Sequence, residues 1–201
     1  RCYTVTHRSR RVLRSRYRAA RFRINGNGQG VRIECPFGVE VHVAGTYVEG
    51  DPDATIEEGQ VVADDLFIGG DDVLIAGVVE GDLFAAGENI VISGEVQGNV
   101  FAAGQTVTVS GEIDGALMLA GYELTLEDGA DIGRNVYFGG FSLSASPESV
   151  IGRSIYGGGY QLILDGEVVR DVTAGLAALE INGPVGGDVT VDIGEPTDDS
   201  T

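Results

Sequence analysis

The chain has 201 residues, of which 43% are hydrophobic, enough for one domain with a sizeable core. No run approaches the ~18 uninterrupted apolar residues of a membrane helix, and the 32 glycines follow no three-residue period, which excludes a collagen. The net charge is −18 without a single lysine, so nucleic acid and anionic membrane surfaces are poor partners for the acidic part of the chain.

Residues 1–33 form a basic arm. They hold ten of the 13 arginines and no acid, whereas the rest of the chain holds all 31 acids, so the arm carries +10 and the rest −28. Weak periodicity predicts a poorly ordered arm, or a helix that forms only on docking. Three interpretations stay open: docking on the acidic body, binding of an anionic polymer or lipid, and translated sequence that belongs to no folded element.

Residues 34–53 are predicted to form a capping strand and a linker, because 38–43 alternates as a strand does. Cys2 and Cys35 allow one disulfide, but their spacing indicates neither a metal site nor a redox motif. Residues 194–201 are an acidic, linker-like tail, and we expect the chain to be a fragment of a longer protein. The acidic, lysine-free body is of the kind that high salt tolerates, which favours a halophilic source.

Between these segments, from Ala54 on, the sequence repeats. Self-similarity at a fixed period is the signature of a stacked solenoid. We expect the two residues added in each longer unit to form bulged turns near 128–131 and 147–149. The eight units are 54–70, 71–87, 88–104, 105–121, 122–140, 141–159, 160–176 and 177–193, six of 17 residues and two of 19.

Alternation of apolar residues within each unit predicts strands. The third position of each unit is expected to point inward: Ile56, Val73, Ile90, Val107, Leu124, Leu143, Leu162 and Leu179. A second inward column is Leu66, Leu83, Val100, Leu117, Val136, Ile155, Val172 and Val189. Corner glycines such as Gly104 supply positive φ or close backbone approach. The fold class is therefore all-β, a single-stranded parallel β-helix of about eight coils, and the absence of a six-residue repeat favours a right-handed one.

Two steps of the repeat, VEGDL at 79–83 and VQGNV at 96–100, are followed by small residues and glycine. Over residues 54–193 this pattern resembles the bactofilins, the polymer-forming cytoskeletal proteins of bacteria and their archaeal relatives. The resemblance implies a right-handed β-helix that polymerises end to end into non-polar, nucleotide-independent filaments, often at the membrane, as a scaffold for cell shape. It implies a homopolymer in the cytoplasm that meets membrane or envelope proteins through segments outside this chain; an extracytoplasmic location stays open.

No catalytic, cofactor-binding or metal-binding residue is predicted, and no enzyme is expected. Catalysis on a β-helix needs clustered acids with a base or histidine on one coil face, and both histidines, His7 and His42, precede the repeat. The acid pairs 64–65 and 71–72 lack the spacing of calcium solenoids and are typical of a solvated face. The competing hypothesis is a β-helical carbohydrate-binding or carbohydrate-active surface protein, with a groove lined by aromatic and acidic side chains.

Three surfaces are candidate contacts. The end coils form the predicted polymer interface: Ile56 and Leu66 at one end, Leu179, Ile181, Val189 and Val191 at the other. A predicted lateral contact stripe consists of Phe67, Phe84, Phe101, Met118, Tyr137 and Tyr156. It is expected to face outward; the alternatives are that a corner turns these side chains inward or that the arm covers them. The arginine ladder, Arg134, Arg153 and Arg170, either is neutralised by neighbours such as Asp171 or docks an acidic partner.

Overall fold

The computed structural model describes residues 53–194 and the backbones of five short strands before them. β1 (Tyr3–Thr4) pairs with β2 (Leu13–Arg14), and β3 (Arg21–Ile24) with β4 (Val31–Glu34), both antiparallel. The rest of the arm, both cysteines, both histidines, the predicted strand at 38–43 and the tail from 195 lie outside the described residues. The described residues contain no helix long and apolar enough to cross a membrane.

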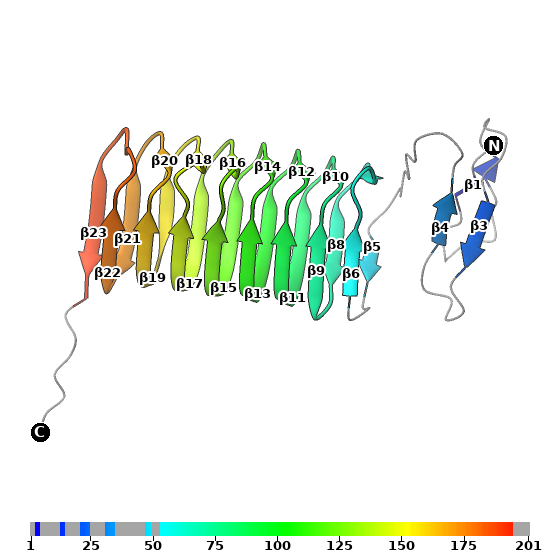
Figure 1. Ribbon diagram of the computed structural model, residues 1–201, viewed down its shortest axis with the longest axis horizontal. Helices are drawn as coiled ribbons and strands as arrows, with labels where there is room; N and C mark the ends of the chain where they lie inside the picture. Colours follow the sequence, from blue (N-terminus) through cyan, green and yellow to red (C-terminus); the bar gives the residue numbers. More distant parts are fainter. Residues whose placement is uncertain are drawn as a thin grey trace, which may run out of the picture.

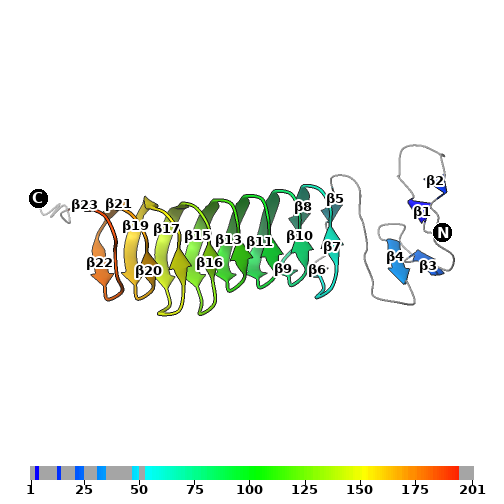
Figure 2. The same cartoon turned by 90° about the horizontal axis from the view of Figure 1, so that it is seen from above.

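Residues 53–193 form a parallel β-solenoid of about eight turns spaced ~17 residues apart, as the repeat predicts. Figures 1 and 2 show the coils stacked along one long axis, with the strands running across it. The smaller sheet has seven two-residue strands: β7 (Val61–Val62), β10 (Val78–Val79), β12 (Glu95–Val96), β14 (Glu112–Ile113), β16 (Asp131–Ile132), β18 (Val150–Ile151) and β20 (Glu167–Val168).

The larger sheet bends around a corner and covers two faces. In β13, inward positions fall at Val100 and Ala102 and then at Val107 and Val109, so the alternation slips by one residue near Gly104. The strands are β5 (Tyr47–Glu49), β6 (Asp53–Ile56), β8 (Leu66–Gly69), β9 (Asp72–Ile75), β11 (Leu83–Ile92), β13 (Val100–Val109), β15 (Leu117–Leu126), β17 (Val136–Ala145), β19 (Ile155–Leu164), β21 (Val172–Leu176), β22 (Ala178–Ile181) and β23 (Val189–Ile193).

We call the segments in register with β8 face 1, those in register with β9 face 2, and the smaller sheet face 3. Equivalent residues of successive coils pair directly, for example Phe84 with Phe101 and Ile90 with Val107. Inward columns are buried along the stack, and Leu83, Leu117 and Val172 are fully covered. The core is therefore a set of aliphatic columns that each coil extends by one layer.

The first coil corrects the predicted alignment. Ala54 pairs with Val73, and Ile56 pairs with Ile75, so Ile56 belongs to the next inward column rather than to the third position. The additional residues of this coil form a bulged turn, besides the two that the sequence predicts near 128–131 and 147–149. In it the Gln60 N–H donates to the Glu57 carbonyl at 3.1 Å, and Gly59 has φ +81°. The alignment failed because Ala54 and Val73 are 19 residues apart, whereas the first unit was counted at 17.

The two predicted bulged turns are confirmed. The Ala130 N–H donates to the Glu127 carbonyl at 3.1 Å, and the Ser149 N–H donates to the Ser146 carbonyl at 3.0 Å. Corner glycines, by contrast, serve close approach: a Cβ on Gly121 would collide with the carbonyl oxygen of the preceding coil. Among the described glycines, only Gly59 and Gly129, both in bulged turns, have positive φ.

Candidate functional site

Face 1 carries an apolar groove of about 790 Å³ along the solenoid. Its wall is the predicted stripe, which we call the ridge: Phe67, Phe84, Phe101, Met118, Tyr137 and Tyr156. Its floor is formed by small residues two positions further along each strand: Gly69, Ala86, Ala103 and Ala120, continued in register by Gly139 and Gly158. Ridge residues alternate with buried ones and Phe101 is 38% exposed, so the stripe faces outward as predicted and the inward alternative is wrong.

Ring stacking builds the ridge. The Phe67 and Phe84 ring centroids lie 4.4 Å apart with 3° between the planes, and those of Phe84 and Phe101 lie 4.7 Å apart with 4°. Tyr137 and Tyr156 stack at 5.5 Å. Because stacked rings cover one another's faces, mainly ring edges remain for a partner.

The groove does not have the lining that the carbohydrate hypothesis predicts. None of the lining residues in the described part of the chain carries a charge, so no carboxylate faces the groove. A sugar ring binds an aromatic side chain through its face, and in Phe84 both faces stack against neighbouring phenylalanines. The groove is instead suited to an apolar partner surface.

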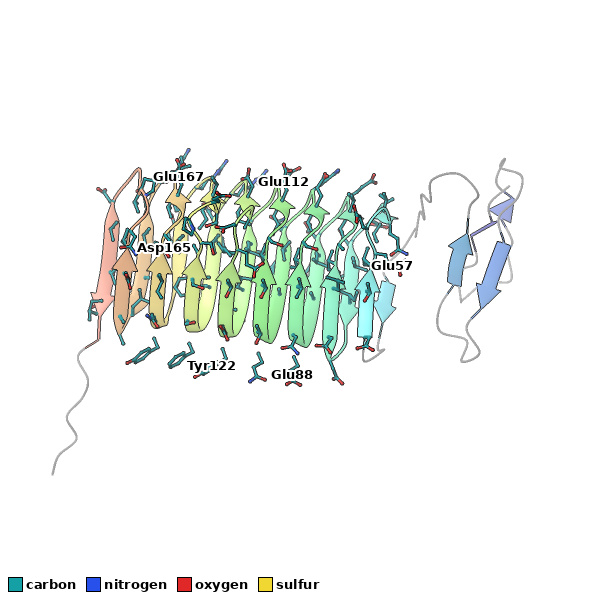
Figure 3. The ribbon with its side chains drawn as sticks, in the orientation of Figure 1. Glu57, Glu88, Glu112, Tyr122, Asp165 and Glu167 are labelled. Atoms are coloured by element: carbon teal, nitrogen blue, oxygen red, sulfur yellow. The ribbon has the colours of Figure 1, made fainter. Side chains whose placement is uncertain are left out.

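A second aromatic ladder at the corner between faces 1 and 2 was missed by the sequence reasoning. Tyr122 and Phe141 stack at 4.7 Å, and Phe141 and Tyr160 at 4.9 Å, with 58%, 41% and 53% of the three residues exposed. Figure 3 shows Tyr122 on the same edge of the solenoid as Glu88, which lies nearer the N-terminal end. The three residues open units five to seven, and comparing the first position of every unit would have found them.

The fourth residue of the repeat steps VEGDL and VQGNV, Asp82 or Asn99, has a structural role. Asp65 Oδ1 accepts from the Asp82 N–H at 2.9 Å, Asp82 Oδ1 from the Asn99 N–H at 2.7 Å, and Asn99 Oδ1 from the Ala116 N–H at 3.0 Å. Each side chain thus satisfies a backbone donor of the next coil at the corner between faces 3 and 1, where the two sheets part. We call this series the Asx ladder.

The arginine ladder also lies at the corner between faces 3 and 1. Arg134, Arg153 and Arg170 are exposed, and the Arg170 N–H donates to the Arg153 carbonyl at 3.1 Å, so they occupy one column as predicted. The Asp171 carboxylate accepts from Ser154 Oγ at 3.4 Å and from the Asp188 N–H at 3.0 Å. The docking role of the arginines stays a prediction.

The two ends of the solenoid differ. At the C-terminal end the inward columns are open: Val189 is 46% exposed where Val172, one coil earlier, is fully buried, and Ile193 is 52% exposed. Leu179, Ile181 and Val191 are half-buried there.

At the N-terminal end, Ile56 and Leu66 are buried, and β5 pairs with β8, so Leu66 lies inside the stack rather than on an outermost strand. The geometry therefore offers the predicted C-terminal residues to a partner more directly than the N-terminal ones.

Over the described residues, no cluster of three or more histidine, cysteine, aspartate or glutamate side chains is arranged to hold a metal ion. Comparisons with protein-family models, curated proteins and solved structures found no match to the chain. The resemblance to the bactofilins therefore rests on the repeat residues alone.

Proposed function

We propose that the chain is a structural subunit that polymerises end to end through its coils into filaments, as the bactofilin resemblance implies. The filament is a homopolymer that needs no nucleotide and serves as a scaffold for cell shape. The observation that carries the proposal is the open C-terminal end, where inward-facing Val189 and Ile193 are about half exposed. In every coil before it, the next coil covers these columns.

Stacking another coil on this end satisfies two kinds of group at once. β23 is the outermost strand of the larger sheet in the described part of the chain, so its free edge offers backbone donors and acceptors for strand addition. Burying a whole aliphatic side chain contributes about 1.5–3 kcal/mol. Five partly exposed ones therefore contribute on the order of 5 kcal/mol, near the low end of the ~4–15 kcal/mol that association costs. Side-chain burial and backbone pairing are both required.

The difference between the ends bears on filament polarity. A non-polar filament, as the resemblance implies, brings one C-terminal end against another. Such a contact is isologous, since the same residues meet from both sides. It places Val189 and Ile193 against their own copies. The filament also needs a second isologous contact between N-terminal ends, where β6 and β7 are the outermost strands of faces 2 and 3 among the described residues.

The proposed setting is the cytoplasm. Contacts with the membrane or with envelope proteins are assigned to segments outside this chain, since a body carrying −28 beyond residue 33 is repelled by anionic lipid. The proposed role is structural rather than catalytic.

The test is a substitution of the open end with a matched control on the same strand. We expect the variant Val189→Asp with Ile193→Asp to lose filaments in negative-stain images while keeping its thermal unfolding midpoint, because both side chains already reach solvent. Thr190→Asp adds a charge between them on the outward side of β23 and should leave filaments intact. Unchanged filaments in the double variant, or a native chain that stays monomeric in dilute and in molar salt, would overturn the proposal.

A further inference from the structure

Face 1 is complementary in shape to a second copy of itself. The ridge and the floor run side by side along the solenoid, and both repeat once per coil, because Phe84 pairs with Phe101 and Ala86 with Ala103 in the same strand pair. A half-turn about an axis parallel to the solenoid, placed between two copies, brings their faces 1 together. It also exchanges the two columns, so each ridge lies over the other copy's floor at the same height.

We propose that face 1 binds a second copy of this chain, side by side and parallel, with the ridge of each copy seated on the floor of the other. The groove lining carries no charge, whereas the body carries −28 after residue 33, so this face is where two such bodies approach with least repulsion. The antiparallel alternative sets ridge against ridge and leaves both floors empty, which buries less apolar surface.

The corners beside the groove add complementary groups in the same arrangement. The half-turn moves the second aromatic ladder of one copy, Tyr122, Phe141 and Tyr160, to the side of the other copy's arginine ladder. Arg134 of one copy then lies at the height of Phe141 of the other, and Arg153 at the height of Tyr160, since each pair belongs to one coil. Phe141 stacks on both Tyr122 and Tyr160, so its ring faces are covered, whereas Tyr160 stacks on one side only and keeps a face that Arg153 of the other copy can approach as a cation–π partner.

Nearer the N-terminal end the same half-turn brings like charges together. Glu88 of one copy lies at the height of Asp82 of the other, and Asp71 at that of Asp65. Salt screens this repulsion, and the Debye length falls to about 3 Å at 1 M. The lateral pair should therefore strengthen as salt rises.

The area of the contact decides whether two single chains or only two filaments associate stably. Six coils about 4.8 Å apart and a strand segment roughly 13 Å wide give about 375 Å² per copy, or about 750 Å² in total. A stable dimer buries about 1,600 Å², so a single pair of chains is weak. Along two filaments the same contact repeats and the strengths multiply. This inference therefore rests on the proposed function for its strength, though not for its geometry.

The first experiment fills the floor. The change Ala103→Leu with Ala120→Leu, at exposed positions of the full chain, makes face 1 more apolar but removes the space that a ridge needs. We expect single filaments to persist and the bundled fraction in molar salt to fall at least tenfold. Thr108→Leu with Thr125→Leu places the same side chains on face 2 of the same strands and should leave bundling unchanged. Stronger or equal bundling of the floor variant would overturn the inference.

The second experiment reads the pairing directly, whether or not filaments form. In the full chain with Cys2→Ser and Cys35→Ser, a Met118→Cys chain is mixed with an Ala120→Cys chain and briefly oxidised. Ridge-on-floor pairing predicts that disulfides between positions 118 and 120 outnumber the 118–118 and 120–120 products.

A predominance of like-with-like products, or the absence of any cross-link at the concentrations where bundles form, would contradict the pairing. Cross-links between 118 and 120 in a chain that forms no filaments would support the ridge-on-floor pairing and contradict only the proposed function. Filaments without these cross-links would contradict the side-by-side pairing and leave the proposed function standing.

Discussion

The seventh and eighth coils have nearly the same inward residues and opposite environments. Val172 and Leu176 are 0% and 4% exposed, whereas Val189 and Ile193, which pair with them one coil later, are 46% and 52% exposed. The eighth coil is thus built as an interior coil, with aliphatic residues where a monomeric solenoid carries a polar cap. Position in the stack, rather than local sequence, leaves these aliphatic side chains exposed.

The largest expected effect comes from the same substitution in both coils. Val172→Asp buries an unpaired carboxylate in the column and should cost several kcal/mol, enough to unfold much of the solenoid. Val189→Asp, one coil further, should change the free energy of unfolding by less than about 1 kcal/mol while weakening assembly. Chemical denaturation followed by circular dichroism measures both. Similar losses for the two variants would show that the eighth coil is covered in solution.

The next effect contrasts two glycines of the same face. An added Cβ on Gly157 would collide with the carbonyl and the ring of Phe138, the largest side chain of its inward column, whereas a Cβ on Gly139 meets nothing within 4 Å. Gly157→Ala should therefore destabilise by about 1–3 kcal/mol, the usual range for overpacking. Gly139→Ala should be neutral or slightly stabilising. Equal midpoints of thermal unfolding would mean that the backbone and the ring of Phe138 shift aside at little cost.

A smaller effect should separate the Asx ladder from ordinary surface hydrogen bonds. Asn99→Ala removes the oxygen that accepts from the half-buried Ala116 N–H at 3.0 Å, which should cost about 1–2 kcal/mol. Asn89→Ala removes only a bond between exposed side chains, from Asn89 Nδ2 to Asp72 Oδ1 at 2.8 Å, and should cost less than about 0.5 kcal/mol. The order of the two losses is the test, measured by the same unfolding experiment.

Salt should change the stability of the whole solenoid by less than the substitutions do. With −28 on the residues after 33, repulsion within the body weakens as potassium chloride rises from dilute to molar. We expect the thermal unfolding midpoint of the chain to rise across that series. A midpoint that falls would show that charge repulsion does not limit stability.

The sequence predicted the solenoid well because each coil repeats the constraint of the last. Column membership at Leu83 or Val136 follows from alternation and a fixed period, and the outward direction of Phe101 follows from its buried neighbours. The turn at Glu57–Gln60 was missed because the first unit was counted at 17 residues; its sequence EEGQ matches EDGA at 127–130, so comparison with the fifth unit would have found it.

Properties that depend on contacts between neighbouring coils could not be predicted from the sequence repeat either. Which end of the stack is open depends on β5, which covers the strand of Leu66, and no period encodes that contact. The groove arises because alanines and glycines beside the ridge leave space, and a list of apolar positions does not show a space. The hydrogen bonds of Asp82 and Asn99 likewise become visible only once successive coils are stacked.

Fibre diffraction from aligned filaments of the full chain tests end-to-end stacking most directly. Coils that continue from one subunit to the next keep their strands across the filament axis, so a strong reflection at about 4.8 Å should lie on the meridian. We expect this reflection in native filaments. A 4.8 Å reflection on the equator, which would place the solenoids across the filament axis, or a chain that forms no filaments at any salt concentration, would contradict it.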